Sequence, residues 1–242
     1  MMHTNHRDRM RQRVLKEGLE NFQEHEILEY LLYPFIPRKD TNPIAHELIT
    51  RFGSLAGVLE SDFNALKEVP NMTQKAALFL SSMPHVVKKY NVSKFGPKPD
   101  LSTHGKVKEY CQTLLSDLNY EVLYLLAVDN RGKLINKSLI GQGSIDDCKL
   151  MTREMVMMCH NLASPNVYIV HNHPSGDANP SITDIEFTKW ATAALEMLGV
   201  RLIDHLIVAK HQLYSFERDG KLGEFRDKYY ELMDSQSLSD KY

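Results

Sequence analysis

The segment from His171 to Asp184 reads HNHPSGDANPSITD. It continues a short apolar run, NVYIVH (166–171), which predicts a buried strand, and it leads into a helical pattern over 181–198 that ends at Gly199. The sequence therefore predicts a strand, a polar turn and a helix in direct succession. Strands mixed with helices that cover them are typical of α/β and α+β folds.

The sequence on both sides of this segment continues the same pattern from residue 103 to residue 227. Helices are expected at 106–118 and at 148–163, where the methionines are typical core-filling residues rather than ligands. Apolar stretches bounded by turn residues predict two hairpins, 121–128 with 133–142 and 201–209 with 212–216. Residues 228–242 are polar and charged, and they predict a C-terminal tail with a frayed end.

The first 90 residues show helical periodicity and need no strand. Helices are expected at 24–33, 42–51, 62–68 and 73–90, with a turn leading into a short helix at 53–59, and Pro84 predicts a kink or a break in the last helix. The next stretch, NVSKFGPKPDLS (91–102), is polar and interrupted by glycine and proline, so it predicts a linker. The expected organisation is a small helical domain (1–90), a linker and a mixed-sheet domain (103–227).

The composition is that of an ordinary globular protein, with 43% hydrophobic and 25% charged residues among 242. The formal net charge of -2 gives no overall positive field that would favour nucleic acid. Three cysteines without a CxxC pair predict reduced thiols rather than disulfides or a thiolate zinc site. No run approaches the roughly 20 apolar residues of a membrane span, and no secretory signal follows the first arginines. These features predict a cytoplasmic protein with no membrane partner.

Two histidines and one carboxylate have the spacing of a metal site. His171 and His173 are two positions apart on an extended strand, so their side chains point to the same face. The ten residues between His173 and Asp184 include a Pro-Ser-Gly turn and Pro180, which allow the chain to fold back. Three protein ligands leave a fourth tetrahedral position open, as in catalytic zinc sites. The segment therefore predicts one zinc ion per chain and a bound water with a pKa of about 7.

Each part of this pattern also has a simpler explanation. An isolated H-x-H occurs by chance, and Ser181 with Asp184 forms the S-x-x-D signature of a helix cap. In that case Asp184 only interacts with the helix dipole. The combination of all the parts favours the metal site, and the cap is compatible with it, because capping fixes the loop that presents the ligand.

The string H-x-H-P with its distant aspartate, and a serine three positions before that aspartate, resembles the JAMM motif of JAB/MPN-type zinc metalloproteases. The longer string HNHPSG followed by PS-x-x-D is similar to the RadC family in particular. Three other strings agree with that family: IDHLIV (203–208), YSF (214–216) and RFGSLAGVLE (51–60). The resemblance covers about residues 6 to 225. It implies a JAB/MPN-like (cytidine deaminase-like) domain behind a helix-hairpin-helix-like module.

The resemblance also implies roles for residues outside the metal trio. In JAMM proteins a glutamate near the start of a core strand takes a proton from the metal-bound water. Glu121 matches that place, and Glu154 is the alternative, although either one also fits an ordinary solvated carboxylate. Ser181 matches the motif serine, whose hydroxyl stabilises an oxyanion. His205 either hydrogen-bonds a metal ligand or is a strand residue satisfied by Asp204 or by the backbone.

The helical module departs from the family pattern at its hairpin. A helix-hairpin-helix that binds DNA commonly has a G-x-G hairpin whose backbone N–H groups approach phosphate. The matching place here is VPNMT (69–73), which has no glycine, and Pro70 has no N–H to donate. Packing or partner docking is therefore the expected role, and DNA binding is not favoured. The basic stretch from Arg7 to Lys16 is either a weak electrostatic patch or a solvated helix.

Three functions remain open on the sequence alone. The favoured one is a JAMM-type zinc hydrolase, a metallopeptidase or isopeptidase, in which zinc-activated water attacks the carbonyl, Glu121 moves the proton and Ser181 stabilises the oxyanion. The second is a RadC-type DNA- or protein-associated factor with a non-catalytic metal. The third, a metal-dependent nuclease, is least expected because no second carboxylate cluster is visible. The substrate and the oligomeric state are not predicted.

Overall fold

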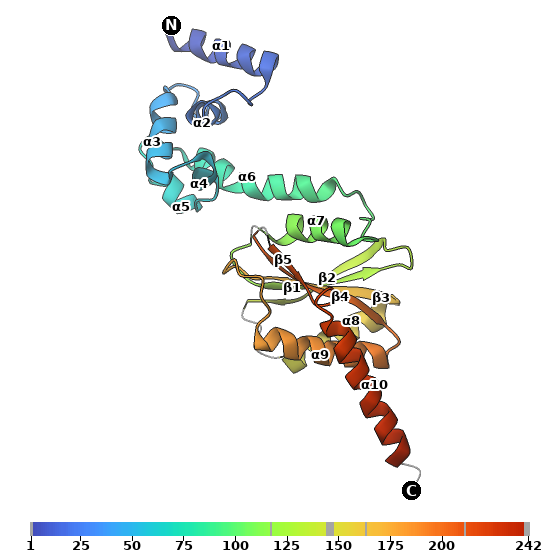
Figure 1. Ribbon diagram of the computed structural model, residues 1–242. Coiled ribbons are helices and arrows are strands. Elements are labelled where there is room, and N and C mark those ends of the chain that lie inside the picture. The colour runs from blue at the N-terminus through green and yellow to red at the C-terminus, as the bar shows by residue number, and fades with distance from the viewer. Residues whose placement is uncertain (1, 117, 144–147, 163, 211, 240–242) are drawn as a thin grey trace. The chain divides into compact units, whose positions relative to one another are not determined.

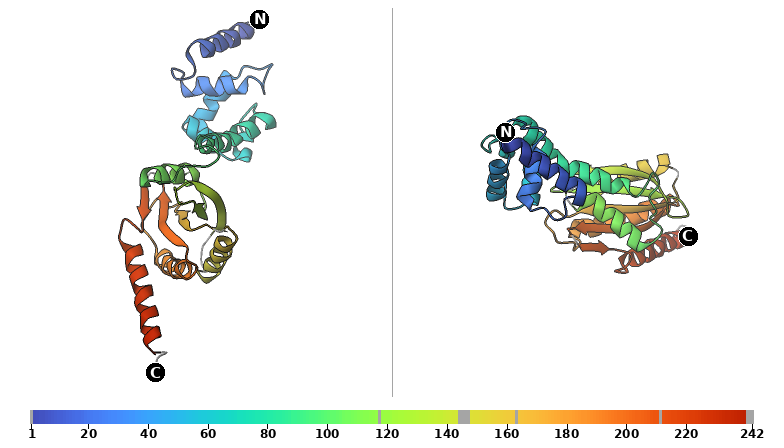
Figure 2. Two further views of the ribbon diagram at one scale, coloured as in Figure 1. Left: turned by 90° about the vertical axis from the view of Figure 1, so that its right-hand side faces the viewer. Right: turned by 90° about the horizontal axis from the view of Figure 1, so that it is seen from above.

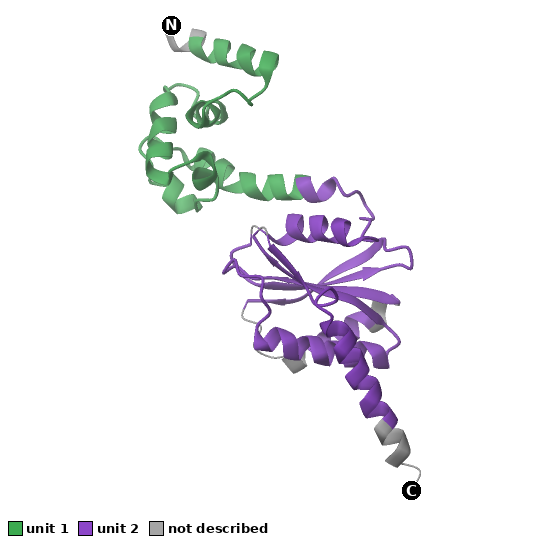
Figure 3. Ribbon diagram, in the orientation of Figure 1, with its two compact units in different colours: residues 1–90 green, residues 91–242 purple. Residues whose placement is uncertain are grey.

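The computed structural model describes residues 2–116, 118–143, 148–162, 164–210 and 212–239 (Figure 1). The chain forms two compact units, Met1–Tyr90 and Asn91–Tyr242 (Figure 3). Among the described residues, unit 1 contains helices and no strand, whereas unit 2 contains a five-stranded sheet with helices. The expected α+β fold, with a helical N-terminal part, is confirmed. None of the described helices is long and apolar enough to cross a membrane.

Unit 1 is built from helices around a main core and a smaller cluster of Met10, Phe22 and Tyr33. Its helices are α1 (Met2–Glu17), α2 (Glu24–Leu32), α3 (Asn42–Phe52), α4 (Leu55–Leu59), α5 (Phe63–Lys67) and α6 (Gln74–Ser93). Leu28, Leu48 and Leu80 are fully buried in the main core. Of the kink or break predicted at Pro84, the break is wrong, since α6 runs through that residue. The fixed φ of proline is itself helical, so the helix continues, although Pro84 donates no hydrogen bond and its ring crowds the carbonyl of residue 80. The kink stays a prediction.

The basic N-terminal stretch is a helix that packs on α2 and on the segment between α2 and α3. The guanidinium of Arg7 donates to the backbone carbonyls of Ile36 and Pro37, at 2.8 and 2.9 Å. Arg13 forms ion pairs with Glu17 and Glu26, both at 2.7 Å. These two arginines therefore make contacts within unit 1, while Arg9, Arg11 and Lys16 on the same helix are exposed, as in the solvated helix that was one expectation.

Unit 2 is a mixed sheet with helices on both faces. Its elements are α7 (His104–Leu115), β1 (Val122–Val128), β2 (Leu134–Gln142), α8 (Cys148–Leu162), β3 (Asn166–Asn172), α9 (Ile182–Met197), β4 (Arg201–Ala209), β5 (Gln212–Ser215) and α10 (Lys221–Ser239). The strand order is β2-β1-β3-β4-β5. Both expected hairpins are confirmed, since β1 pairs with β2 and β4 with β5 in antiparallel fashion. In contrast, β3 and β4 are parallel, and α9 forms the crossover between them.

Alternation along the central strands gives the sheet two apolar faces. In β1, Leu125 belongs to the core under α8, α9 and α10, whereas Leu126 belongs to the core under α7. Figure 1 and the left view of Figure 2 show α7 on one face of the sheet and α8 with α9 on the other. Both leucines are fully buried, because a strand covered on both faces has no solvent side.

The segment 91–102, expected as a linker, belongs to unit 2, and its first three residues end α6. Leu101 is fully buried, and its N–H donates to the carbonyl of Gly132 at 2.7 Å. Asp100 forms ion pairs with Lys106 and Lys133, at 2.9 and 3.0 Å. Gly132 has φ of +72°, and a Cβ there would lie 2.6 Å from Cα of Ser102, so this turn requires glycine.

The C-terminal segment after residue 227 is helical rather than a frayed tail as far as Ser239. Its helix, α10, packs on α9 through an apolar start, where Leu222 and Phe225 enter the core. Farther along, the hydroxyl of Tyr230 donates to Glu196 on α9 at 2.7 Å. The polar composition fits this contact and the exposure of residues 231–234. The frayed end predicted for the chain falls on residues 240–242, outside the described residues.

Asp204 is a buried carboxyl group on the α7 face of β4, 5% exposed. It accepts hydrogen bonds from the hydroxyl of Ser215 at 2.5 Å and from the N–H of Glu217 at 2.9 Å. Burial raises the pKa of Asp204 from 3.8 to about 6, although these hydrogen bonds lower it. Ionised Asp204 therefore opposes folding.

We expect Asp204→Asn to remove a pH dependence of stability between about pH 4 and 7. A carboxyl whose pKa is higher in the folded state stabilises below its unfolded pKa, and this contribution is lost as pH rises through about 6. A shift of about two units corresponds to about 3 kcal/mol. Denaturant unfolding followed by the fluorescence of Trp190, the single tryptophan, should show wild type losing up to that amount relative to the variant. Parallel curves of unfolding free energy against pH for wild type and variant would contradict this. Asp227→Asn, at an exposed position, is the control for loss of a charge.

Candidate metal centre

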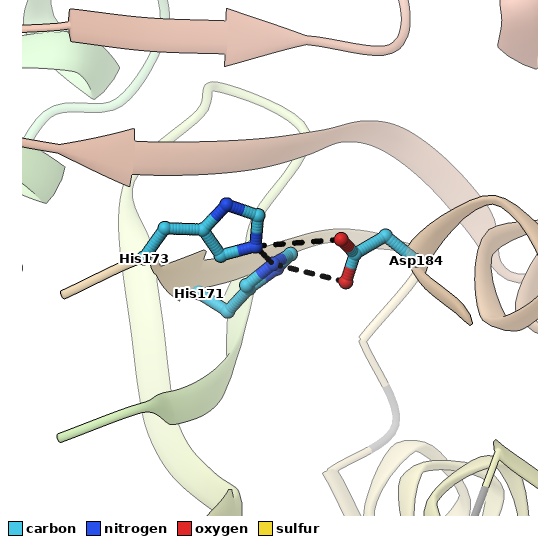
Figure 4. A group of neighbouring side chains, drawn as sticks. All are labelled: His171, His173 and Asp184. Atoms are coloured by element: carbon cyan, nitrogen blue, oxygen red, sulfur yellow. Dashed lines mark hydrogen bonds and ion pairs between the residues drawn. The ribbon is translucent and has the colours of Figure 1, made fainter. Parts of the chain in front are cut away.

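The predicted metal ligands meet where β3 ends and α9 begins. His171 is near the end of β3, His173 follows that strand, and Asp184 is in the first turn of α9. Figure 4 shows the two imidazole rings and the carboxylate converging on one point. The loop between them folds back because the N–H of Gly176 donates to the carbonyl of His173 at 3.1 Å. Gly176 has φ of +89°, which favours glycine at this position.

The spacing of the three side chains fits one metal ion. Nε2 of His171 lies 3.0 Å from Nε2 of His173 and 3.1 Å from Oδ1 of Asp184. Nε2 of His173 lies 3.3 Å from Oδ2 of Asp184. Ligands about 2.0–2.1 Å from a tetrahedral zinc are separated from one another by about 3.3 Å. The three donor atoms therefore have nearly the separation of one face of a zinc tetrahedron, and the residues present fit such an ion.

The charge state of the site also suits a cation. Burial opposes ionisation of Asp184, but without a metal the Nε2–H groups of His171 and His173 in their doubly protonated form, together with the Ser181 hydroxyl, hydrogen-bond it and hold the pKa of this carboxyl well below its usual range. The hydrogen bond to Asp184 raises the pKa of His173, against the lowering effect of burial. Asp184 is thus an ionised acceptor at neutral pH, as a metal ligand must be.

Asp184 is held in place by the helix cap. Oγ of Ser181 accepts from the N–H of Asp184 at 3.1 Å, while Oδ2 of Asp184 accepts from the N–H of Ser181 at 2.7 Å. The hydroxyl of Ser181 also donates to Oδ2, at 2.6 Å. Asp184 is therefore both a member of the capping box and a candidate metal ligand, and the cap orients its carboxylate.

A family model described as RadC-like JAB domain matches residues 101–221, which is half of the chain. This stretch includes His171, His173, Asp184 and the whole sheet of unit 2. The chain belongs to the RadC family. The resemblance stated from HNHPSG and PS-x-x-D is thereby confirmed, and the trio occupies the place of the JAMM-like metal group in this RadC-like JAB domain.

The two candidate proton carriers of the RadC domain lie on different elements. Glu121 immediately precedes β1 and is half-buried. Because β1 and β3 are antiparallel, with Leu123 opposite His171, continuing the register places Glu121 opposite His173 on the same face. Its carboxylate is one of the charges that raise the pKa of His173. Glu154 is also half-buried, but it lies on α8, which covers that face. The register is therefore an argument for Glu121 as the candidate proton carrier.

His205 lies beside the metal centre, although the sequence left its role open. Its Nε2 is 2.9 Å from Nδ1 of His171, and its Nδ1 is 2.6 Å from Oγ1 of Thr188. Asp204 points to the opposite face of the sheet, so it does not satisfy the His205 ring. Complete burial lowers the pKa of His205 well below its ordinary value, so the ring is neutral at pH 7. Thr188 was not predicted at all, since a threonine inside a helix has no distinguishing local signal.

The turn between α5 and α6 contains a residue with a positive φ, although it has no glycine. Asn71 has φ of +65°, a conformation that asparagine tolerates better than most residues. Its Oδ1 accepts from Nζ of Lys39 at 2.8 Å. Oγ1 of Thr73 accepts from the N–H of Ala76 at 3.1 Å and so caps α6. The turn between α5 and α6 therefore has a residue with positive φ that is not glycine, and the side chains of Asn71 and Thr73 form hydrogen bonds there.

We expect the purified protein to hold close to one zinc per chain, and His173→Ala to lose most of it, because only two ligands remain. Metal content after dialysis, measured by mass spectrometry, tests this. His85→Ala is the matched control, since His85 is exposed on α6 in unit 1. Equal metal content in wild type and His173→Ala would show that the trio is not the site.

Proposed function

We propose that this RadC-family protein is a zinc-dependent hydrolase of the JAMM type, acting on peptide or isopeptide bonds. The observation that carries the proposal is the accessible three-ligand face. His171 is 3% exposed, whereas the side chains of His173 and Asp184 are 14% and 16% exposed. The solvent-exposed side of the site is thus that of His173 and Asp184, and in this proposal the substrate approaches from there. A zinc ion bound there would supply Lewis-acid activation of water at neutral pH.

In this proposal Glu121 carries the proton. Its carboxylate lies opposite His173 in the strand register, at the accessible side of the trio. From this place it takes a proton from the attacking water and delivers it to the leaving nitrogen of the cleaved bond. General acid–base catalysis of this kind contributes about 10²–10⁴-fold to rate.

Ser181 acts on the site through Asp184. The single hydroxyl hydrogen of Ser181 is donated to Oδ2 of Asp184. Direct donation to an oxyanion, as the family resemblance implies, requires that the hydroxyl turns away from Asp184. Orientation of the carboxylate is therefore the first role that we assign to Ser181, and oxyanion stabilisation the second.

The alternative, a DNA- or protein-associated factor with a non-catalytic metal, has less support. The side chains of Asn71 and Thr73 stand at the hairpin where backbone N–H groups would have to approach phosphate. Arg7 and Arg13 are already used within unit 1. Docking of a protein partner on unit 1 is compatible with either function. We place the protein in the cytoplasm, where buried thiols such as Cys111 and Cys159 stay reduced.

Glu121→Gln should lower kcat/KM by about 10²–10⁴-fold while leaving zinc content unchanged, because Glu121 moves a proton and is not a ligand. The assay is a screen of peptide and isopeptide substrates with zinc-loaded protein. Glu154→Gln is the matched control and should retain activity. Failure of the wild type to cleave any substrate would count against hydrolysis, and loss of activity only in Glu154→Gln would transfer the proton role to that residue.

Ser181→Ala separates the two roles of the serine. If the hydroxyl only orients Asp184, both zinc affinity and activity should fall. If it also stabilises an oxyanion, kcat should fall by about 10²–10³-fold, more than the loss of zinc explains. Steady-state kinetics at saturating zinc, together with chelator competition, measure both quantities. An unchanged kcat with unchanged affinity would remove Ser181 from the site chemistry.

A further inference from the structure

We propose that Thr188 and His205 are positioning residues that fix the proton of His171 on Nδ1, so that the lone pair of its Nε2 faces the metal position. This inference rests on the metal site of the proposed function and adds to it the device that orients one ligand. The residues involved come from α9, β4 and β3, and they form a continuous chain of hydrogen bonds.

The first hydrogen bond of the series, from Thr188 to Asp184, determines which atom donates in each of the others. Oγ1 of Thr188 lies 2.5 Å from the backbone carbonyl oxygen of Asp184. A carbonyl oxygen can only accept, so the hydroxyl of Thr188 must donate its single hydrogen there. Toward its other neighbour, Nδ1 of His205 at 2.6 Å, the same hydroxyl can therefore only accept. His205 must carry its proton on Nδ1.

The second half of the chain follows from the first. A neutral histidine protonated on Nδ1 has an acceptor at Nε2. Nε2 of His205 is 2.9 Å from Nδ1 of His171, so Nδ1 of His171 must be the donor. Its proton is thus held on the nitrogen that points away from the other ligands. Nε2 of His171, 3.0 Å from His173 and 3.1 Å from Asp184, is left as the metal-binding nitrogen.

The surroundings of this chain exclude other partners. Thr188 and His205 are both 0% exposed, so bulk water cannot replace either bond. The ring of His205 stacks on Phe216 with centroids 4.9 Å apart and planes 6° apart. Phe187 meets the same ring edge-on at 5.9 Å. These aromatic contacts fix the plane of the ring, and with it the direction of both nitrogens.

In His173 the proton is fixed on Nδ1 by a single hydrogen bond to the backbone. Nδ1 of His173 lies 2.8 Å from the backbone carbonyl of Asp177, which can only accept. The backbone therefore fixes His173 directly as the Nδ1–H form. At the more buried His171, the neighbour at that nitrogen is another histidine, which can donate or accept. Thr188 determines that His205 accepts the hydrogen bond from Nδ1 of His171 rather than donating one.

The test reads tautomers and zinc affinity in the full-length protein. Long-range proton–nitrogen spectra of protein labelled with ¹⁵N-histidine, with and without zinc, should show His205 protonated on Nδ1 alone. Thr188→Ser keeps the hydroxyl and should preserve this pattern. Thr188→Val removes the acceptor, so the His205 signature should change and zinc affinity, measured by chelator competition, should fall about 10–100-fold. Thr192→Val is the matched control, being equally buried one turn later on α9.

A His205 protonated on Nε2 in the wild type would overturn the inference, as would a Thr188→Val protein with wild-type zinc affinity. Should Thr188→Val fail to fold, the wild-type and Thr188→Ser spectra still decide the matter. Hydrolysis is not read in this experiment, so an inactive protein with the stated tautomers sinks only the proposed function. A wild type that binds no zinc likewise counts against the proposed function, while the tautomer of His205 is still read without metal.

Discussion

The parallel pairing of β3 with β4 is the constraint on which the metal centre depends. Parallel neighbours cannot be joined by a tight turn, so the chain must leave the end of β3, cross the sheet as α9 and return. This crossover brings the first turn of α9, with Asp184, to the end of β3, where His171 lies. The same pairing places His205 opposite Ile169, on the face that His171 occupies. One strand–helix–strand unit thus supplies the trio and the residues behind it.

The trio could be predicted from the sequence because its geometry is local. The two-residue repeat of a strand places His171 and His173 on one face, and the S-x-x-D cap fixes where α9 begins. Both hairpins followed from equally local patterns of apolar and turn residues. In each case the residues that decide the structure are close together in the chain, so their periodicity was sufficient.

The sequence could not decide between the two roles considered for His205, because the decision depends on a register irregularity. Along β3 and β4 the pairing runs from Val167 opposite Leu202 directly to Tyr168 opposite Asp204, omitting Ile203. Without that irregularity, Asp204 and His205 would exchange faces. Distant contacts explain the other differences as well. Arg7 binds carbonyls about 30 residues away, and Leu101 is anchored by Gly132, which no local pattern of residues reveals.

Asp184 has a double attachment that constrains how this site can vary. Its carboxylate belongs to the ligand group, while its backbone carbonyl starts the chain of bonds that ends at His171. The loop that follows His173 determines the angle at which α9 starts. Adding or removing a residue there would rotate both attachments of Asp184 together, and the carboxylate and one imidazole would lose alignment at once. Substitutions of exposed side chains in this loop are therefore compatible with the site, whereas insertions and deletions are not.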